Sequence, residues 1–111
     1  MPKKCRVAVS ASGETLDSDI GPISRSPYFV IFEGSSDNHR AMKNRASGMG
    51  DEAGPQAADA LVKNDITIVI TSTVGAKTFQ ALRKADIVVH AGCSGKVSEA
   101  IQKCLHGELL E

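Results

Sequence analysis

The sequence predicts a single α/β domain, spanning residues 1–111, with a mixed sheet of about five strands and three helices on its faces. Short, strongly apolar segments alternate with segments whose apolar residues recur at helical spacing. The helical segments all fall in the second half of the chain, where apolar segments separate them as in right-handed βαβ units. The 111 residues are enough for one domain with its own hydrophobic core.

Three strands are expected in the first half of the chain. Residues 5–10 are expected to form a strand, in which successive side chains point to opposite faces and Val7 and Val9 share one apolar face. The segment YFVIFE, at 28–33, is rich in aromatic and β-branched residues, which favour strands. A turn-rich stretch separates these two strands, and GSSDN is a turn by composition. A third strand, of edge character, is expected over 39–46.

A first helix is expected between Pro55 and Asn64. Proline is favoured at the first helical position because its missing N–H would have no partner there. Asp51 and Glu52, just before it, suit the positive end of the helix dipole. The apolar side chains form one stripe, made of Ala57, Ala58, Leu61 and Val62.

Two further strands are expected at 66–70 and 87–90. The sequence ITIVI shows no alternation, which is typical of a strand buried on both faces, and the second segment has the same character. We therefore expect adjacent parallel strands, both covered by helices.

Helices are expected to follow each of these strands. The first of them, over 76–85, should direct Phe79 and Leu82 inward. The other, over 96–105, has its apolar residues at helical spacing: Val97, Ala100, Ile101, Cys104 and Leu105.

Charge and composition exclude several classes of protein. Thirteen cationic and thirteen acidic residues balance, which argues against binding of nucleic acid. No apolar run approaches the roughly 20 residues of a membrane span, and the start of the chain has no long apolar segment of the kind found in signal peptides. We expect a cytoplasmic protein. Three cysteines without a CxxC pair fit a reducing compartment.

Three connections that lead into the helices are rich in glycine or hydroxyl residues. They read SGMGDEAGP, TSTVGAK and AGCSGK. The last two leave the carboxyl ends of parallel strands, where open α/β sheets bind ligands. Because helix amino ends carry unpaired N–H groups and partial positive charge, several on one edge would form an anion site. Glycine and serine at such positions also serve as simple turns and caps, so the pattern alone leaves both interpretations open.

Recognisable catalytic motifs are missing from the sequence. There is no GxxxxGK[ST] phosphate loop, dinucleotide fingerprint or GxSxG elbow. The three histidines are widely spread, and Asp17 and Asp19 lie in a loop without an acid on the first strand. Cys5 and Cys104 fall on core-facing stripes. Cys93, between a strand end and a helix start, is the one cysteine that is a candidate metal contact, and a loop cysteine without such a role is the alternative.

The sequence resembles the dinitrogenase iron–molybdenum cofactor biosynthesis family over nearly its whole length. The resemblance is carried by RSPYFVIFE, AGPQAADALVKNDITIVIT, TVGAKTFQALRKADIVV and GKVSEAIQKCLHGEL. It implies a ribonuclease-H-like fold and a protein that carries a metal–sulfur cofactor. Family members commonly have a His- or Arg-Phe-Gly-Arg segment before the Pro-Tyr-Phe strand, whereas GPISRSPYF keeps Arg25 alone. The histidine often found before the AGPQAA helix is also missing here.

These departures favour the orange-protein branch of the family, in which a molybdenum–copper sulfide cluster is held without a strong protein ligand. An iron–molybdenum cofactor or its precursor is the alternative cargo. We expect a non-enzymatic carrier or storage protein whose partners are the cluster and an acceptor or cofactor-assembly protein. The alternatives are a regulatory domain that binds a nucleotide or phosphometabolite and, less favoured, an enzyme of the ribonuclease-H-like class.

The expected site gathers the glycine-rich connections and nearby cationic and soft side chains on one edge of the sheet. Met42 and Met49 would be soft neighbours of the sulfide. The expected residues are Ser12, Gly13, Ile23, Arg25, Met42, Lys43, Met49, Gly50, Gly54, Ser72, Thr73, Val74, Gly75, Lys77, Gly92, Ser94, Gly95 and Lys96, with Cys93 as a metal candidate.

Overall fold

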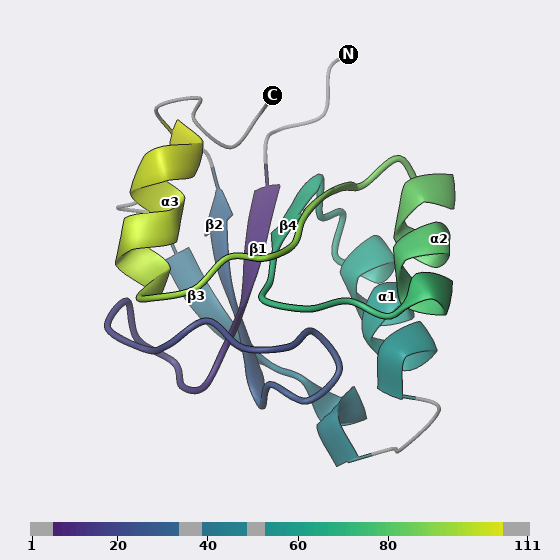
Figure 1. Ribbon diagram of the computed structural model, residues 1–111, viewed down its shortest axis with the longest axis horizontal. Coiled ribbons are helices and arrows are strands. Elements are labelled where there is room, and N and C mark those ends of the chain that lie inside the picture. Colours follow the sequence, from purple (N-terminus) through teal and green to yellow (C-terminus); the bar gives the residue numbers. More distant parts are fainter. Residues whose placement is uncertain (1–5, 34–38, 49–52, 106–111) are drawn as a thin grey trace.

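The computed structural model of the chain describes residues 6–33, 39–48 and 53–105 (Figure 1). Its strands are β1 (Arg6–Ala11), β2 (Tyr28–Glu33), β3 (His39–Lys43), β4 (Ile68–Ile70) and β5 (Val88–His90). Its helices are α1 (Ala53–Lys63), α2 (Ala76–Lys84) and α3 (Val97–Leu105), with a short 3₁₀ turn, η1 (Arg45–Gly48).

The five strands form one mixed sheet in the order β3-β2-β1-β4-β5. β1 lies in the middle, antiparallel to β2 and parallel to β4. The outer pairs are antiparallel β2–β3 and parallel β4–β5. This confirms the expected α/β domain with five strands and three helices. The ribonuclease-H-like assignment stays a prediction.

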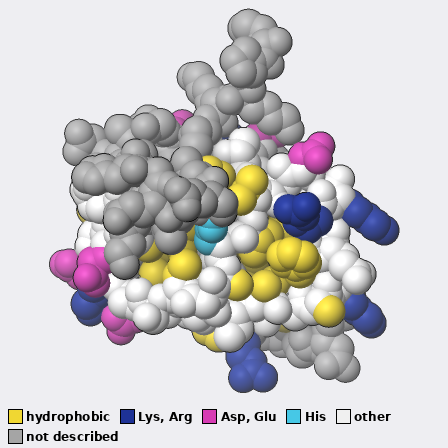
Figure 2. All heavy atoms as spheres, turned by 45° about the horizontal axis from the view of Figure 1, so that its top comes forward, with side chains coloured by type: hydrophobic (Ala, Val, Ile, Leu, Met, Phe, Trp, Pro, Cys, Tyr) yellow, Lys and Arg dark blue, Asp and Glu magenta, His cyan; other side chains and the backbone are white. Residues whose placement is uncertain are grey.

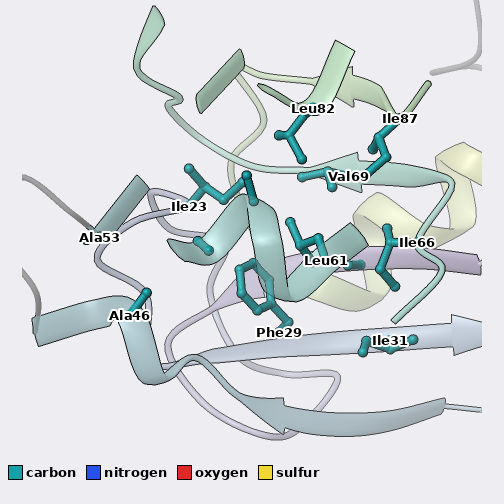
Figure 3. Packing of buried hydrophobic residues seen from close by; sticks show 13 residues of the cluster. Ile23, Phe29, Ile31, Ala46, Ala53, Leu61, Ile66, Val69, Leu82 and Ile87 are labelled. Carbon is teal, nitrogen blue, oxygen red and sulfur yellow. The ribbon is translucent and has the colours of Figure 1, made fainter. Parts of the chain in front are cut away.

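Helices cover both faces of the sheet, α1 and α2 on one side and α3 on the other (Figure 1). The alternation of β1 divides its residues between the two layers: Ala8 faces α1, and Val7 and Val9 face α3. Leu61 of α1 and Phe29 and Ile31 of β2 belong to the first layer (Figure 3). The second layer contains Val30, Phe32, Ile68, Ile70, Val97, Ala100 and Ile101.

The two segments expected as adjacent parallel strands do pair in that way. The expectation that both are buried is wrong for one of them. β4 and β5 are adjacent and parallel, and Ile66 through Ile70 supply both layers. β5, however, is the outermost strand, and Val88 is 42% exposed. The apolar character of this segment therefore does not reflect cover on both faces.

The inward orientation expected for Phe79 is also wrong, since its side chain is 41% exposed. α2 instead buries Thr78 and Leu82. A Cβ on Gly54 of α1 would collide with the Oγ1 of Thr78, so the two helices meet closely at this glycine. This contact sets the rotation of α2 and leaves Phe79 at the margin of the packed stripe.

Element boundaries shift by a few residues from those expected. α1 begins at Ala53, so Pro55 is its third residue, still within the first turn where an N–H is dispensable. It ends at Lys63, and Asp65 takes the left-handed conformation, with φ of 57°. The strand expected over 39–46 ends at Lys43 and continues as η1. Cys5, Asp51 and Glu52 lie outside the described residues.

Candidate functional site

One edge of the sheet collects the segments that the sequence places at the site. β1, β3, β4 and β5 end there and β2 begins there, as the strand directions require. We call this edge the rim. The connections that leave it, at 12–27, 44–48, 71–75 and 91–96, include every expected site residue except those on β3 and α2, Gly54, and the pair Met49 and Gly50. Met49 and Gly50 lie outside the described residues.

A buried pair of hydroxyl side chains holds the centre of the rim. Ser10, at the end of β1, and Thr71, just after β4, are both fully buried. The Oγ atom of Ser10 lies 2.8 Å from the Oγ1 atom of Thr71 and 2.6 Å from the carbonyl oxygen of Gly21. Thr71 also donates toward Gly21 O at 3.1 Å or Thr73 O at 3.2 Å. The pair therefore fixes two strand ends and the loop across them.

The long loop after β1 is bound to both later connections by backbone hydrogen bonds. The N–H of Ile23 donates to Thr73 O at 3.2 Å, and the N–H of Ser72 donates to Gly21 O at 3.2 Å. At the other end, the N–H of Ile20 donates to Gly95 O at 2.9 Å. The connections at 12–27, 71–75 and 91–96 thus form one ordered surface.

The amino end of α2 is open on this surface. Its N-cap residue, Gly75, has φ of −72° and ψ of 159° and makes no side-chain cap hydrogen bond. Gly75, Ala76 and Lys77 are exposed, and a Cβ at Gly75 would meet no described atom within 4 Å. The first N–H groups of this helix are therefore accessible to an anion.

The amino end of α3, by contrast, is already occupied by the protein. The N–H of Val97 donates to Ser18 O and that of Ser98 to Leu16 O, both at 3.0 Å. The N–H of Lys96 donates to the Oε1 of Glu99 at 3.1 Å, which is half of a capping box. Three of the N–H groups that the sequence assigns to an anion are thus paired within the chain.

The described residues at the amino end of α1 pack against the rest of the protein. Ala53 is buried, and Gly54 faces Thr78 of α2, so this glycine serves the close approach of two helices.

The expected residues divide into two groups along the rim. Ser12, Gly13, Ser72–Lys77 and Gly92–Lys96 lie together around the ends of β1, β4 and β5. Met42 and Lys43 end β3, three strands from β4, a separation of roughly 14 Å.

The loop at 20–27 spans the space between these two groups. The Nδ2 of buried Asn44 donates to Ile23 O at 3.0 Å and to Ser26 O at 2.8 Å. The side chain of Ile23 is 1% exposed in the core, so its contribution to a ligand would come from the backbone alone.

Cationic side chains occur along the rim and at the start of α2, without forming a block of one sign. Arg25 and Lys77 are exposed and make no ion pair with the described part of the chain. Lys96 is 3.1 Å from the Oδ1 of Asp19. Figure 2 brings forward the end of the sheet opposite to the rim, and basic and acidic side chains are spread there around hydrophobic ones.

Cys93 and His90 lie next to each other at the end of β5. The Sγ of Cys93 donates to the carbonyl oxygen of His90 at 3.7 Å, and its side chain packs against the α3 layer. Burial lowers the pKa of His90 below its ordinary value, and its Nε2 has no hydrogen-bond partner among the described residues. No group of three histidine, cysteine or acidic side chains that could hold a metal ion occurs in these residues.

The sequence does not predict the roles of Ser10, Thr71 and Asn44. All three are buried, and their side chains hold the loops of the rim in place by hydrogen bonds. Ser10 and Thr71 are hydroxyl residues at the ends of apolar strands. A polar residue at such a position is the sequence feature that could have indicated them. Asn44 falls inside the stretch interpreted as strand and carries no such signal.

Comparisons with known proteins agree with this architecture. The sequence matches the family described as "Dinitrogenase iron-molybdenum cofactor" over residues 3–107. The apo form of the orange protein from Desulfovibrio gigas is 31% identical, with a TM-score of 0.89 over 98% of this chain and 93% of that one. A NifB-like protein of the DUF35 family from Thermotoga is 30% identical, with a TM-score of 0.77 over 94% and 90% of the two chains.

Two further findings bear on the assignment. The comparison with curated proteins gives no significant match. Among the described residues, no helix has the length and apolar character needed to cross a bilayer. The family match covers far more than half of the sequence and confirms the resemblance. The chain therefore belongs to the dinitrogenase iron–molybdenum cofactor family.

Proposed function

We propose that the protein is a non-enzymatic, cytoplasmic carrier that binds a molybdenum-containing metal–sulfide cluster without covalent attachment. A molybdenum–copper sulfide cluster is the favoured cargo, and an iron–molybdenum cofactor or precursor is the alternative. Family membership supports a role in handling such a cofactor. The carrier would receive the cluster from an assembly protein or deliver it to an acceptor.

The observation that carries the proposal is the open amino end of α2. The connection that leads into this helix end contacts the exposed loop of Gly92, because the N–H of Gly92 donates to Ser72 O at 2.9 Å. A Cβ added to Gly92 would meet no described atom within 4 Å. Arg25 and Lys77 add positive charge that is not neutralised by the described part of the chain. We place the cluster against Ser72–Lys77 and Gly92.

The chemistry of a thiometalate suits these groups. Its sulfides carry negative charge and accept N–H hydrogen bonds, and they also tolerate apolar surface. A helix-end contact contributes about 0.3–1 kcal/mol at an exposed site and up to about 2 kcal/mol when partly buried. Several such contacts would hold the cluster reversibly, as delivery to an acceptor requires.

Anaerobic reconstitution of the apo-protein with tetrathiomolybdate and copper tests the cargo. We expect a coloured complex that retains molybdenum, copper and sulfide through gel filtration. Protein that stays colourless and instead binds a nucleotide or a phosphorylated metabolite would contradict the proposal, because the same N–H groups also suit phosphate.

Two cation variants test the placement of the cluster. Arg25→Ala and Lys77→Ala should each weaken binding by about 1–2 kcal/mol, the scale of a hydrogen bond to a charged group. Lys84→Ala, at the other end of α2, is the matched control and should bind as the wild type does. Equal losses in all three variants would count against the placement, since they would reflect net charge alone.

A further inference from the structure

β3 is the outer strand at one end of the sheet, and its outward backbone groups are unpaired in the described structure. The N–H of Asn44 donates to Pro27 O at 2.7 Å, which continues the β2–β3 register. Because hydrogen-bonded pairs alternate in antiparallel strands, Arg40 and Met42 pair with β2. The N–H and C=O groups of Ala41 and Lys43 therefore point away from the sheet.

The same edge carries positive charge. Residues 39–48 contain Arg40, Lys43 and Arg45 and no acidic residue, although the whole chain is neutral. All three cationic residues are exposed, and none makes an ion pair with the described part of the chain.

A cavity of about 260 Å³ lies beside this edge, between the end of β3, η1 and α1. Apolar atoms of partly buried Met42, buried Ala46 and partly buried Ala60 contribute to its lining. Lys63 also lines it, 2.9 Å from the Oδ2 of Asp59. The cavity is large enough to take one side chain of a bound segment.

We propose that the β3 edge docks an extended, acidic segment of a partner protein, which adds a strand beside β3. The outward groups of Ala41 and Lys43 would supply the ladder hydrogen bonds. Carboxylates of the segment would face the cations, and one apolar side chain would enter the cavity. This site lies at the far end of the rim from the proposed cluster contacts and does not depend on them.

The opposite edge differs in length and in the charge of its cavity. β5 is three residues long, and the cavity of about 200 Å³ beside it is lined by the acidic Asp86 as well as by Arg83. Positive charge on an edge strand can also serve only to prevent aggregation. A protective edge needs no adjoining cavity with apolar lining, so the cavity favours docking.

A peptide probe tests the docking mode directly. The acetylated and amidated peptide Glu-Val-Glu-Val-Glu-Val-Glu is titrated into the full-length protein, with Lys-Val-Lys-Val-Lys-Val-Lys as the matched control. Hydrogen exchange of single amides is followed by NMR. We expect the acidic peptide to slow exchange at Ala41 by about tenfold or more and to leave Met42, which already pairs with β2, unchanged.

Variants separate the backbone contribution from the charge. Ala41→Pro removes one outward donor from an edge strand, where proline is tolerated, and should weaken binding about fivefold. Arg40→Glu should weaken it about fivefold or more, and Arg83→Glu, near the other edge, should not. Raising salt from about 0.01 M to about 0.1 M should also weaken binding, because the Debye length falls from about 30 Å to about 10 Å.

Failure of the proposal has a clear signature. Absence of protection at Ala41 with saturating acidic peptide would overturn it, as would equal binding of both peptides or an unchanged affinity in Arg40→Glu. Because Arg40 is exposed, the amide spectrum of Arg40→Glu should match that of the wild type outside the β3 edge, so this variant tests the proposal even if Ala41→Pro does not fold. The two proposals can fail separately: the peptide could bind to a protein that carries no cluster, and a protein that carries the cluster could fail to bind the peptide.

Discussion

At the scale of single residues, the glycines of the rim differ in what their backbone demands. Gly75 has a φ that any residue adopts and open space around it. Gly95 has φ of 94°, in the region that side chains rarely adopt, and a Cβ there would lie 3.1 Å from the Oε1 of Glu99. The sequence predicts that both glycines belong to the candidate site, and the structure shows open space at Gly75 and a positive φ at Gly95.

Valine substitutions exploit this difference. Gly75→Val should lose about 1 kcal/mol of stability or less, because valine is a poorer N-cap than glycine, and it should lose cluster affinity, because its side chain stands over the open N–H groups. Gly95→Val should lose about 1–3 kcal/mol of unfolding free energy from the strained backbone. Urea denaturation and cluster titration of both variants measure the two effects. A destabilised Gly75→Val that binds the cluster normally would contradict this account.

His90 should make the protein less stable in mild acid. Its pKa is lowered by burial, so the unfolded chain binds more protons than the folded one between that lowered pKa and the ordinary value of about 6.5. The free energy of unfolding should therefore fall as pH falls below about 6.5, and the His90 contribution should be constant above it.

The variant His90→Phe isolates this contribution. Denaturation curves at a series of pH values should show a smaller acid loss for the variant than for the wild type. Parallel curves for the two proteins from about pH 7 to about pH 5 would show that His90 is not responsible.

At the scale of elements, patterns in the sequence predict which strands and helices form and which strands pair. They predict less well which side chains those elements bury. The run from Ile66 to Ile70, apolar except for Thr67, predicts a buried strand, and its apolar side chains do supply both layers. A similar run, Ile87–Val89, ends at an edge because no sixth strand of the described chain follows β5. The exposure of Phe79 depends on a contact between two helices, which no single helix pattern contains.

That contact between α1 and α2 can be tested by a double substitution. Gly54→Ala brings a Cβ against the Oγ1 of Thr78, so the helices must separate, at a cost of about 1–3 kcal/mol. Thr78→Ala removes the obstructing oxygen, and the remaining Cβ distance of 3.5 Å is ordinary contact. The pair should therefore recover much of the loss in thermal or urea unfolding. Strictly additive effects would exclude direct contact as the cause.

At the scale of the whole molecule, the sequence predicts where the site lies but not which of its groups are available. The strand order brings the glycine-rich connections to one edge, as expected from the βαβ pattern. The hydrogen bonds from Val97 and Ser98 to the first loop, by contrast, join residues that are about 80 apart in sequence, and no local pattern indicates them. Among the described residues, the α3 end is therefore closed by the chain itself, whereas the α2 end is open.

The central claim is that a metal–sulfide cluster binds at the amino end of α2. The most direct test compares backbone amide chemical shifts of the apo-protein with those of protein reconstituted with tetrathiomolybdate and copper. Our account predicts the largest changes at Ser72–Lys77 and Gly92, with small changes at Val97 and Ser98, whose N–H groups are already bonded. Changes confined to the opposite ends of the strands, or to the carboxyl ends of the helices, would contradict it.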